Sequence, residues 1–165
     1  TGIRFLKEAQ AQAVKLEGGV RVIEQIKALV KYGIPVMGHL GMTPQSVNAF
    51  GGFKVQGRHE SGEAIIADAK ALQEAGCFAI VLELIPAELA ERITSELAIP
   101  IIGIGAGPSC DAQVLVWNDL MGLTAKPPKF ARKYRDLRGE MSEAVQEWIA
   151  DVENGTFPSE NETFH

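Results

Sequence analysis

The stretch that decides the fold is AGCFAIVLELIP, residues 75–86. Gly76 can end a helix in the left-handed conformation, and the apolar run directly after it is typical of a buried parallel strand. Pro86 then stands where the first turn of a helix tolerates proline. The stretch therefore predicts the end of one helix, a buried strand over residues 78–84 and the start of a second helix.

The same alternation continues on both sides of this stretch. Residues 32–36, YGIPV, repeat the junction of helix, glycine and strand. Amphipathic patterns predict helices over residues 20–30, 64–74 and 87–97. Apolar, β-branched runs predict strands over residues 13–17, 35–40, 78–84, 99–104 and 114–120. Repeated strand–helix units give an α/β fold with a parallel sheet, either an open sheet or part of an eight-stranded barrel.

Other segments lie outside this alternation. Residues 2–12 have a helical pattern without the usual residues of a helix start, and residue 1 is not methionine. We therefore expect this chain to be a piece of a longer polypeptide. Residues 41–62 have little helical pattern, and a loop of that length is usually functional or flexible. Residues 140–152 predict a helix whose apolar side is buried within the subunit or used in subunit contacts. The polar tail, residues 156–165, is expected to be peripheral.

Composition narrows the class of protein. The 165 residues are 46% hydrophobic and 22% charged, as in an ordinary globular domain. The net charge of -5 argues against a nucleic-acid or anionic-membrane surface. No signal peptide and no apolar span of about 18 residues is present, so we expect a cytoplasmic protein. Two cysteines are too few for a disulfide framework or a four-ligand zinc site, and Cys77 is expected to be a buried thiol.

Two charged residues interrupt the first predicted strand. Positions two apart in a strand point to the same face, so Lys15 and Glu17 project together, with Glu17 nearer the carboxyl end. Ligands bind at that end in parallel α/β folds. One interpretation is that Lys15 holds an anionic substrate group and Glu17 faces a hard cation. The other is a plain salt bridge at a strand end, and the pattern does not favour either.

Glu83 is the sharpest signal, because it is a carboxylate inside an apolar run. A carboxylate there must be neutralised, paired or used, and glutamate is a common general base. The alternative is that Glu83 lies just past the strand and caps the next helix. We favour a functional role.

His39 and a glycine-rich loop are weaker signals. His39 lies near a strand end, where a hydrogen-bonded structural histidine is at least as plausible as a catalytic one. The loop GIGAGP, residues 103–108, lacks the spacing of a dinucleotide fingerprint, and Pro108 interrupts the helix start. Glycines there allow the backbone to approach a ligand or a neighbouring strand closely.

Three stretches resemble one family, ketopantoate hydroxymethyltransferase. They are AVKLEGG (residues 13–19), GHLGMTPQSVN with GGFKVQGR (residues 38–58) and IIGIGAG (residues 101–107). The second stretch is long and specific. The resemblance implies a (β/α)₈ TIM barrel, of which the whole chain, residues 1–165, is a partial domain that supplies about strands four to eight and a C-terminal helix.

The resemblance also implies an activity. The family transfers a hydroxymethyl group from 5,10-methylenetetrahydrofolate to 3-methyl-2-oxobutanoate, giving 2-dehydropantoate for pantothenate biosynthesis through a Mg²⁺-stabilised enolate. By position, Glu83 resembles the catalytic proton acceptor and Glu17 a carboxylate of the Mg²⁺ site. Lys15 resembles the substrate-binding lysine, and His39 an active-site histidine whose role stays open. The implied partners are the 2-oxo acid, the folate and further copies of the chain, often in a decamer.

The sequence departs from the family at its start. Two aspartates of the family's metal site lie in the first three strands, which this chain does not contain. Two rival functions therefore remain. One is another Mg²⁺-dependent 2-oxo-acid or phosphoenolpyruvate barrel enzyme, which residues 41–58 disfavour. The other is a truncated, non-catalytic assembly subunit, which the joint presence of Lys15, Glu17 and Glu83 disfavours.

Overall fold

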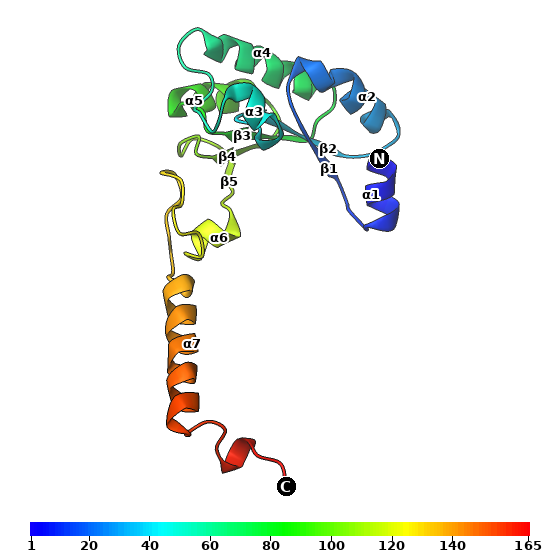
Figure 1. Ribbon diagram of the computed structural model, residues 1–165. Coiled ribbons are helices and arrows are strands. Elements are labelled where there is room, and N and C mark those ends of the chain that lie inside the picture. Colours follow the sequence, from blue (N-terminus) through cyan, green and yellow to red (C-terminus); the bar gives the residue numbers. More distant parts are fainter. The chain divides into compact units, whose positions relative to one another are not determined.

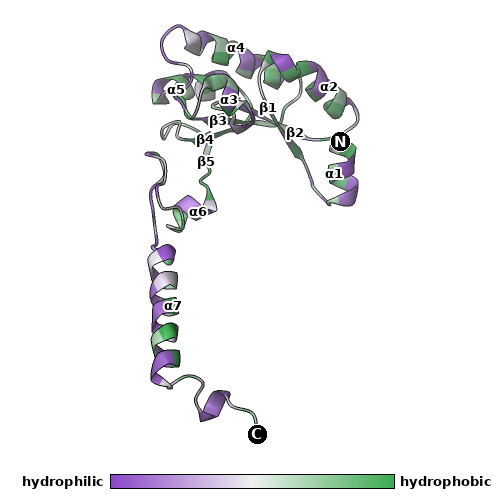
Figure 2. Cartoon of the chain, in the orientation of Figure 1, coloured by the Kyte–Doolittle hydropathy of each residue, from purple (hydrophilic) through white to green (hydrophobic).

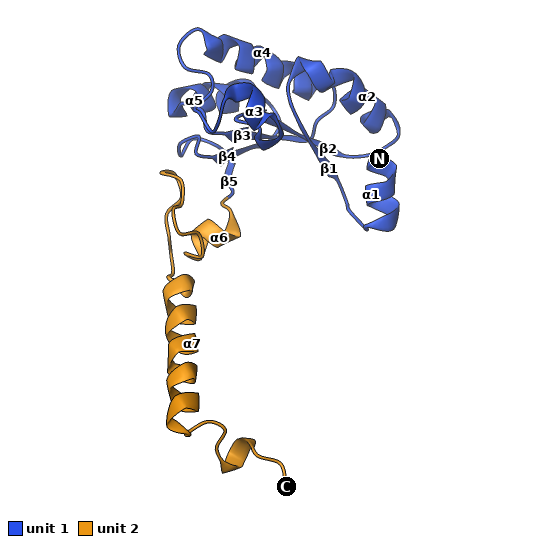
Figure 3. Ribbon diagram, in the orientation of Figure 1, with its two compact units in different colours: residues 1–114 blue, residues 115–165 orange.

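Five strands form one parallel sheet, in the same order as along the chain (Figure 1). They belong to residues 1–114, the first of two compact units in a computed structural model that describes residues 1–165 (Figure 3). The strands are β1 (Val14–Glu17), β2 (Val36–Gly41), β3 (Ala79–Glu83), β4 (Ile101–Ile104) and β5 (Ala112–Gln113). The predicted α/β class with a parallel sheet is confirmed.

Three helices cover one face of this sheet. In Figure 1, α2 (Ile23–Lys31), α4 (Ser61–Glu74) and α5 (Ala87–Glu96) lie on the same side of the strands. Each helix buries apolar side chains against alternate strand residues, in a single core. That core includes Ile26, Val36, Leu40, Ile66, Leu72, Ile80, Leu82, Ile93 and Ile101. The alternation of the strands therefore leaves the intervening side chains on the opposite face.

The predicted junctions of helix, glycine and strand are present. Gly33 and Gly76 follow the ends of α2 and α4 with φ of 75° and 96°, a left-handed conformation that favours glycine. Before β1 the chain forms α1 (Gly2–Glu8), which is shorter than the predicted helix. A 3₁₀ turn, η1 (Val20–Val22), leads into α2.

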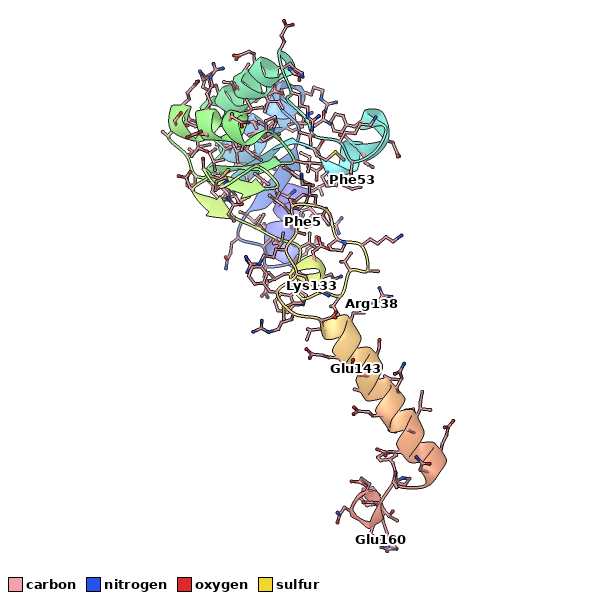
Figure 4. The ribbon with its side chains drawn as sticks, turned by 90° about the vertical axis from the view of Figure 1, so that its left-hand side faces the viewer. Phe5, Phe53, Lys133, Arg138, Glu143 and Glu160 are labelled. Atoms are coloured by element: carbon pink, nitrogen blue, oxygen red, sulfur yellow. The ribbon has the colours of Figure 1, made fainter.

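The long connection after β2 contains more helix than its sequence predicts. It forms η2 (Pro44–Ser46) and α3 (Val47–Phe50) before an extended stretch leads to α4. Pro44 begins the first turn, and Gly51, with φ of 65°, ends α3. Phe53 follows at the protruding end of the loop, with 67% of its surface exposed (Figure 4).

The fifth predicted strand was placed wrongly. Residues 114–120 do not form a strand, and β5 is instead the pair Ala112–Gln113. Within the predicted run, Trp117–Leu120 forms the short helix α6. The physical reason lies in Asn118 and Asp119, which are poor strand formers. The carbonyl oxygen of Asn118 accepts hydrogen bonds from the N–H groups of Leu123 and Thr124, which closes a turn.

The second unit, residues 115–165, is dominated by α7 (Leu137–Asn154). Gly155, with φ of 69°, ends this helix as the sequence predicts. No residue of α7 is buried within this unit. Figure 2 shows apolar patches along α7, where Met141, Val145, Trp148 and Val152 are exposed. No helix in the chain has both the length and the apolar character needed to cross a bilayer.

Candidate active site

Three adjacent strands bring the predicted site residues to one place. The register pairs Glu17 of β1 with His39 of β2, and Gly41 of β2 with Glu83 of β3. Leu40 and Leu82 belong to the core under the helices, and the partly buried Leu16 packs against it. Lys15, Glu17, His39 and Glu83 therefore lie on the opposite face, toward the carboxyl ends of the strands.

The four side chains form a continuous chain of contacts. Lys15 Nζ lies 3.0 Å from His39 Nδ1, and His39 Nε2 lies 3.1 Å from Glu83 Oε2. Glu17 Oε1 lies 3.6 Å from Lys15 Nζ and 3.7 Å from His39 Nδ1. His39 is thus at the centre, with a carboxylate on each side. The arrangement joins an ammonium group, an imidazole and two carboxylates within a single sheet face.

Three of the four side chains are largely shielded from solvent. The side chains of His39, Glu17 and Glu83 are 4%, 8% and 14% exposed, whereas that of Lys15 is 42% exposed. Buried carboxylates must be paired or hydrogen-bonded, because their desolvation is costly. With a neutral imidazole, the two carboxylates outnumber the single ammonium group. A further cation, or a ligand that donates hydrogen bonds to these carboxylates, would therefore balance the charge of the cluster.

The contact with Lys15 determines how His39 holds its proton. An ammonium group only donates hydrogen bonds, so Nδ1 of His39 must be the acceptor. A neutral imidazole then carries its hydrogen on Nε2. Although Nε2 lies close to Glu83, the alignment is not that of a hydrogen bond, and Nε2 is buried without a hydrogen-bond partner. This nitrogen is therefore an unsatisfied donor beside the Glu83 carboxylate.

Almost the whole chain matches a single protein family. Residues 1–160 match the family model described as ketopantoate hydroxymethyltransferase. The chain belongs to this family. The resemblance stated from the three sequence stretches is thereby confirmed.

Curated relatives of the ketopantoate hydroxymethyltransferase family are close in sequence. The chain is 58% identical over 162 residues to a protein of Mycobacterium ulcerans and 59% identical over 159 residues to one of Acidothermus cellulolyticus. A protein of Geotalea uraniireducens is 57% identical over 164 residues. All three are named 3-methyl-2-oxobutanoate hydroxymethyltransferase. The matches cover 98%, 96% and 98% of this chain but only 54%, 59% and 61% of the relatives, so the chain spans somewhat more than half of their length.

Two residues that support the site were not predicted from the sequence. The N–H of Gln45, in η2, donates to Glu17 Oε2 at 2.9 Å and so fixes the orientation of that carboxylate. Asp68 of α4 accepts a hydrogen bond from the N–H of Val20 at 2.9 Å, just after the strand that carries Glu17. A Cβ at Gly19 would overlap the Asp68 carboxylate, so any other residue there would displace Asp68 from its contact with Val20. No local pattern marks either contact, because each joins distant parts of the chain.

The glycine-rich loop has a packing role in this structure. At Gly107, with φ of 79°, a Cβ would press against Ala87 in the first turn of α5. At Gly103 it would press against Cys110 Sγ. Gln113 Nε2 also donates to the carbonyl oxygen of Gly107 at 3.0 Å. The predicted close approach is present, and it is to helix α5 and to the loop itself.

The residues of this chain do not by themselves fit a Mg²⁺ site. No group of three or more histidine, cysteine, aspartate or glutamate side chains has the arrangement to hold a metal ion. Mg²⁺ requires six oxygen ligands in near-octahedral geometry, usually with carboxylates among them. Glu17 offers one carboxylate, of which Oε2 already accepts the Gln45 N–H. This chain can therefore contribute at most part of the ligand set.

Proposed function

We propose that this chain carries the proton acceptor and part of the substrate site of a hydroxymethyltransferase that acts on 3-methyl-2-oxobutanoate. The observation that supports this most directly is the position of the largely buried Glu83 carboxylate, 3.1 Å from His39 Nε2, while the Lys15 ammonium group contacts the other ring nitrogen of His39. The family membership and the name of the relatives give the reaction type. The proposed one-carbon donor is 5,10-methylenetetrahydrofolate, and the product is 2-dehydropantoate.

Glu83 is the proposed general base. Its carboxylate would take the proton from C3 of the 2-oxo acid, next to the ketone, which leaves an enolate. The enolate carbon would bond to the one-carbon unit of the folate while the first of its two carbon–nitrogen bonds breaks. Water would then displace the second nitrogen and supply the hydroxyl oxygen. One proton from C3 and one from this water would end on the two nitrogens of tetrahydrofolate. Lys15, which is partly exposed at the same end of the sheet, would place positive charge where negative charge develops on the substrate.

His39 is proposed to orient the reacting groups. Its Nε2–H would donate either to Glu83 or to an oxygen of the substrate, which would satisfy a buried donor that has no partner in the structure. We also propose that the reaction depends on Mg²⁺ and that Glu17 is one carboxylate of the metal site. Because the ligand set here is incomplete, we assign no step of the reaction to the metal.

The proposed whole fold is a (β/α)₈ barrel that this chain completes in part. Strands β1 and β5 form the two edges of the sheet, and neither has a further strand partner. An apolar groove of about 490 Å³ runs beside β1, lined by Ile3, Phe5, Val14, Leu16, Leu29 and Ile34 among others. Three further strand–helix units would pair with both edges and cover the groove. We also propose that the protein forms a homo-oligomer and is located in the cytoplasm.

Hydrogen exchange at C3 of the substrate tests the proposed function. The whole protein is incubated with Mg²⁺ and 3-methyl-2-oxobutanoate in D₂O, and loss of the C3 proton is followed by NMR without folate. We expect Glu83→Gln to slow the exchange by about 10² to 10⁴-fold, since a general base is removed. The matched control is Glu88→Gln, in the exposed first turn of α5. Equal rates for Glu83→Gln and the native protein would refute the assignment of the base.

A further inference from the structure

Leu84 has a backbone conformation that its side chain disfavours. It follows Glu83 directly and has φ of 52°, in the left-handed region. Only Gln10 and His59 among the other non-glycine residues have positive φ, and both are exposed polar residues outside helices and strands. Leucine rarely adopts this conformation, because Cβ approaches the following carbonyl oxygen. Such strain persists where the surrounding structure imposes it, often at functional sites.

Three backbone hydrogen bonds impose the turn at Leu84. The carbonyl oxygen of Glu83 accepts from the N–H of Met42 at 2.8 Å. The N–H of Leu84 donates to the carbonyl oxygen of Ile104 at 2.9 Å, and its own carbonyl oxygen accepts from the N–H of Gln56 at 3.0 Å. The chain after Glu83 is therefore held by the ends of both neighbouring strands and by the long loop. Gly41 makes this possible, since a Cβ there would overlap the Glu83 carbonyl oxygen.

The turn also changes which side chains enter the core. Strict alternation after Leu82 and Glu83 would point Leu84 toward the helices and Ile85 toward the site. Instead Ile85 is 3% exposed and belongs to the core, whereas Leu84 does not. The left-handed residue thus ends the strand immediately after Glu83 and sends the chain back under the helices. Glu83 remains on the site face, with Oε2 at 3.1 Å from His39 Nε2.

The geometry points to Leu84 as a positioning residue for the proposed base. Its left-handed turn ends β3 directly after Glu83 and ties this strand end to the long loop through Gln56, which holds the backbone of Glu83 in place. The inference rests on the proposed function of Glu83 as the proton acceptor. It assigns the effect to the backbone conformation of Leu84 and not to its side chain.

Two substitutions at Leu84 separate backbone from side chain. Leu84→Ile keeps the volume but adds β-branching, which excludes the left-handed conformation, whereas Leu84→Gly adopts that conformation without strain. We expect Leu84→Ile to lower kcat for C3 exchange at least about tenfold with little change in KM, because a misplaced base slows chemistry more than binding. Leu84→Gly should keep kcat within about threefold of the native value, by the same argument. Leu97→Ile is the matched control, since Leu97 has an extended backbone that suits a β-branched residue.

Amide hydrogen exchange gives a readout that does not depend on activity. In Leu84→Ile the amides of Met42 and Gln56 should exchange at least about tenfold faster, because their acceptors move, and in Leu84→Gly they should stay protected. Unchanged kcat in Leu84→Ile, even with faster amide exchange, would show a purely structural role and overturn the inference. An equal loss of kcat in Leu84→Gly would overturn it too. A native protein without C3 exchange would refute the proposed function. Unchanged amide protection in Leu84→Ile would show that the conformation of Leu84 does not control these backbone hydrogen bonds, which would overturn the inference.

Discussion

At the scale of single residues, the contact between Lys15 and His39 leads to a spectroscopic prediction. In the native protein, ¹⁵N NMR of the His39 ring should show an unprotonated Nδ1 and a protonated Nε2, because the ammonium group can only donate. Lys15→Met removes that donor, so we expect the Nδ1–H form to become populated. Lys27→Met, on the exposed surface of α2, is the control. A protonated Nδ1 in the native protein would contradict the assigned tautomer.

The buried thiol of Cys77 leads to a second residue-level prediction. Burial raises its pKa from 9.0 to about 11, and the residue is 3% exposed. Since the unfolded chain releases this proton first, stability should fall as the pH rises from about 9 to about 11, by roughly 2 kcal/mol in total. Urea unfolding of the native protein and of Cys77→Ala across this range measures the difference. A Cys77→Ala protein with the same alkaline loss of stability would contradict the assignment to this thiol.

The convergence of the four site residues could be foreseen in part. Alternation places Lys15 and Glu17 on one face, and the carboxyl ends of parallel strands meet at one edge, so nearness to His39 and Glu83 follows. The supporting contacts could not be foreseen, because the Gln45 N–H and the turn at Leu84 depend on how a long loop meets two strand ends. Such contacts leave no local pattern in the sequence.

At the scale of elements, two glycines with similar conformations allow a controlled test of how closely the ends of β2 and β3 pack. Gly33 and Gly41 both have positive φ, but only at Gly41 would a Cβ overlap another group, the carbonyl oxygen of Glu83. We expect Gly33→Ala to cost about 1 kcal/mol of unfolding free energy, the conformational term alone. Gly41→Ala should cost at least about 3 kcal/mol, because steric overlap with backbone is added. Urea titration measures both, and equal losses would contradict the packing argument.

The elements were predicted well where local chemistry determines them. Glycine after a helix and a continuous apolar run identify β2 and β3 to within one residue at each end. The predicted strand over residues 114–120 failed because its apolar residues surround Asn118 and Asp119, whose turn-forming tendency prevails. The short helices in residues 44–50 were missed because a single turn has no measurable periodicity.

At the scale of the whole molecule, the open edges of the sheet lead to an association experiment. If the proposed further barrel strands pack on β1 and its groove, residues 1–165 mixed with the N-terminal portion of the Geotalea uraniireducens relative should form a one-to-one complex. We expect the complex to have a higher Tm than either piece, since binding stabilises the folded state. Size-exclusion chromatography and thermal unfolding measure this.

A groove variant controls for non-specific association. Phe5 lines the groove and is 52% exposed, so Phe5→Ser should weaken the complex without removing buried core. A substitution of an exposed apolar residue far from the groove, Phe53→Ser, should not. Failure of the native pieces to associate, or equal weakening by both substitutions, would contradict the barrel arrangement.

The order of the strands in the sheet has a consequence for how the chain folds. From β2 onward, each strand of this sheet pairs with the one synthesised just before it. Loop closure is therefore confined to the connection between two neighbouring strands at a time, which keeps the entropic barrier of each step small. A chain that emerges from the ribosome at about 5–20 residues per second can add each strand as it appears. Growth of the sheet from β1 toward β5 then follows the direction of translation.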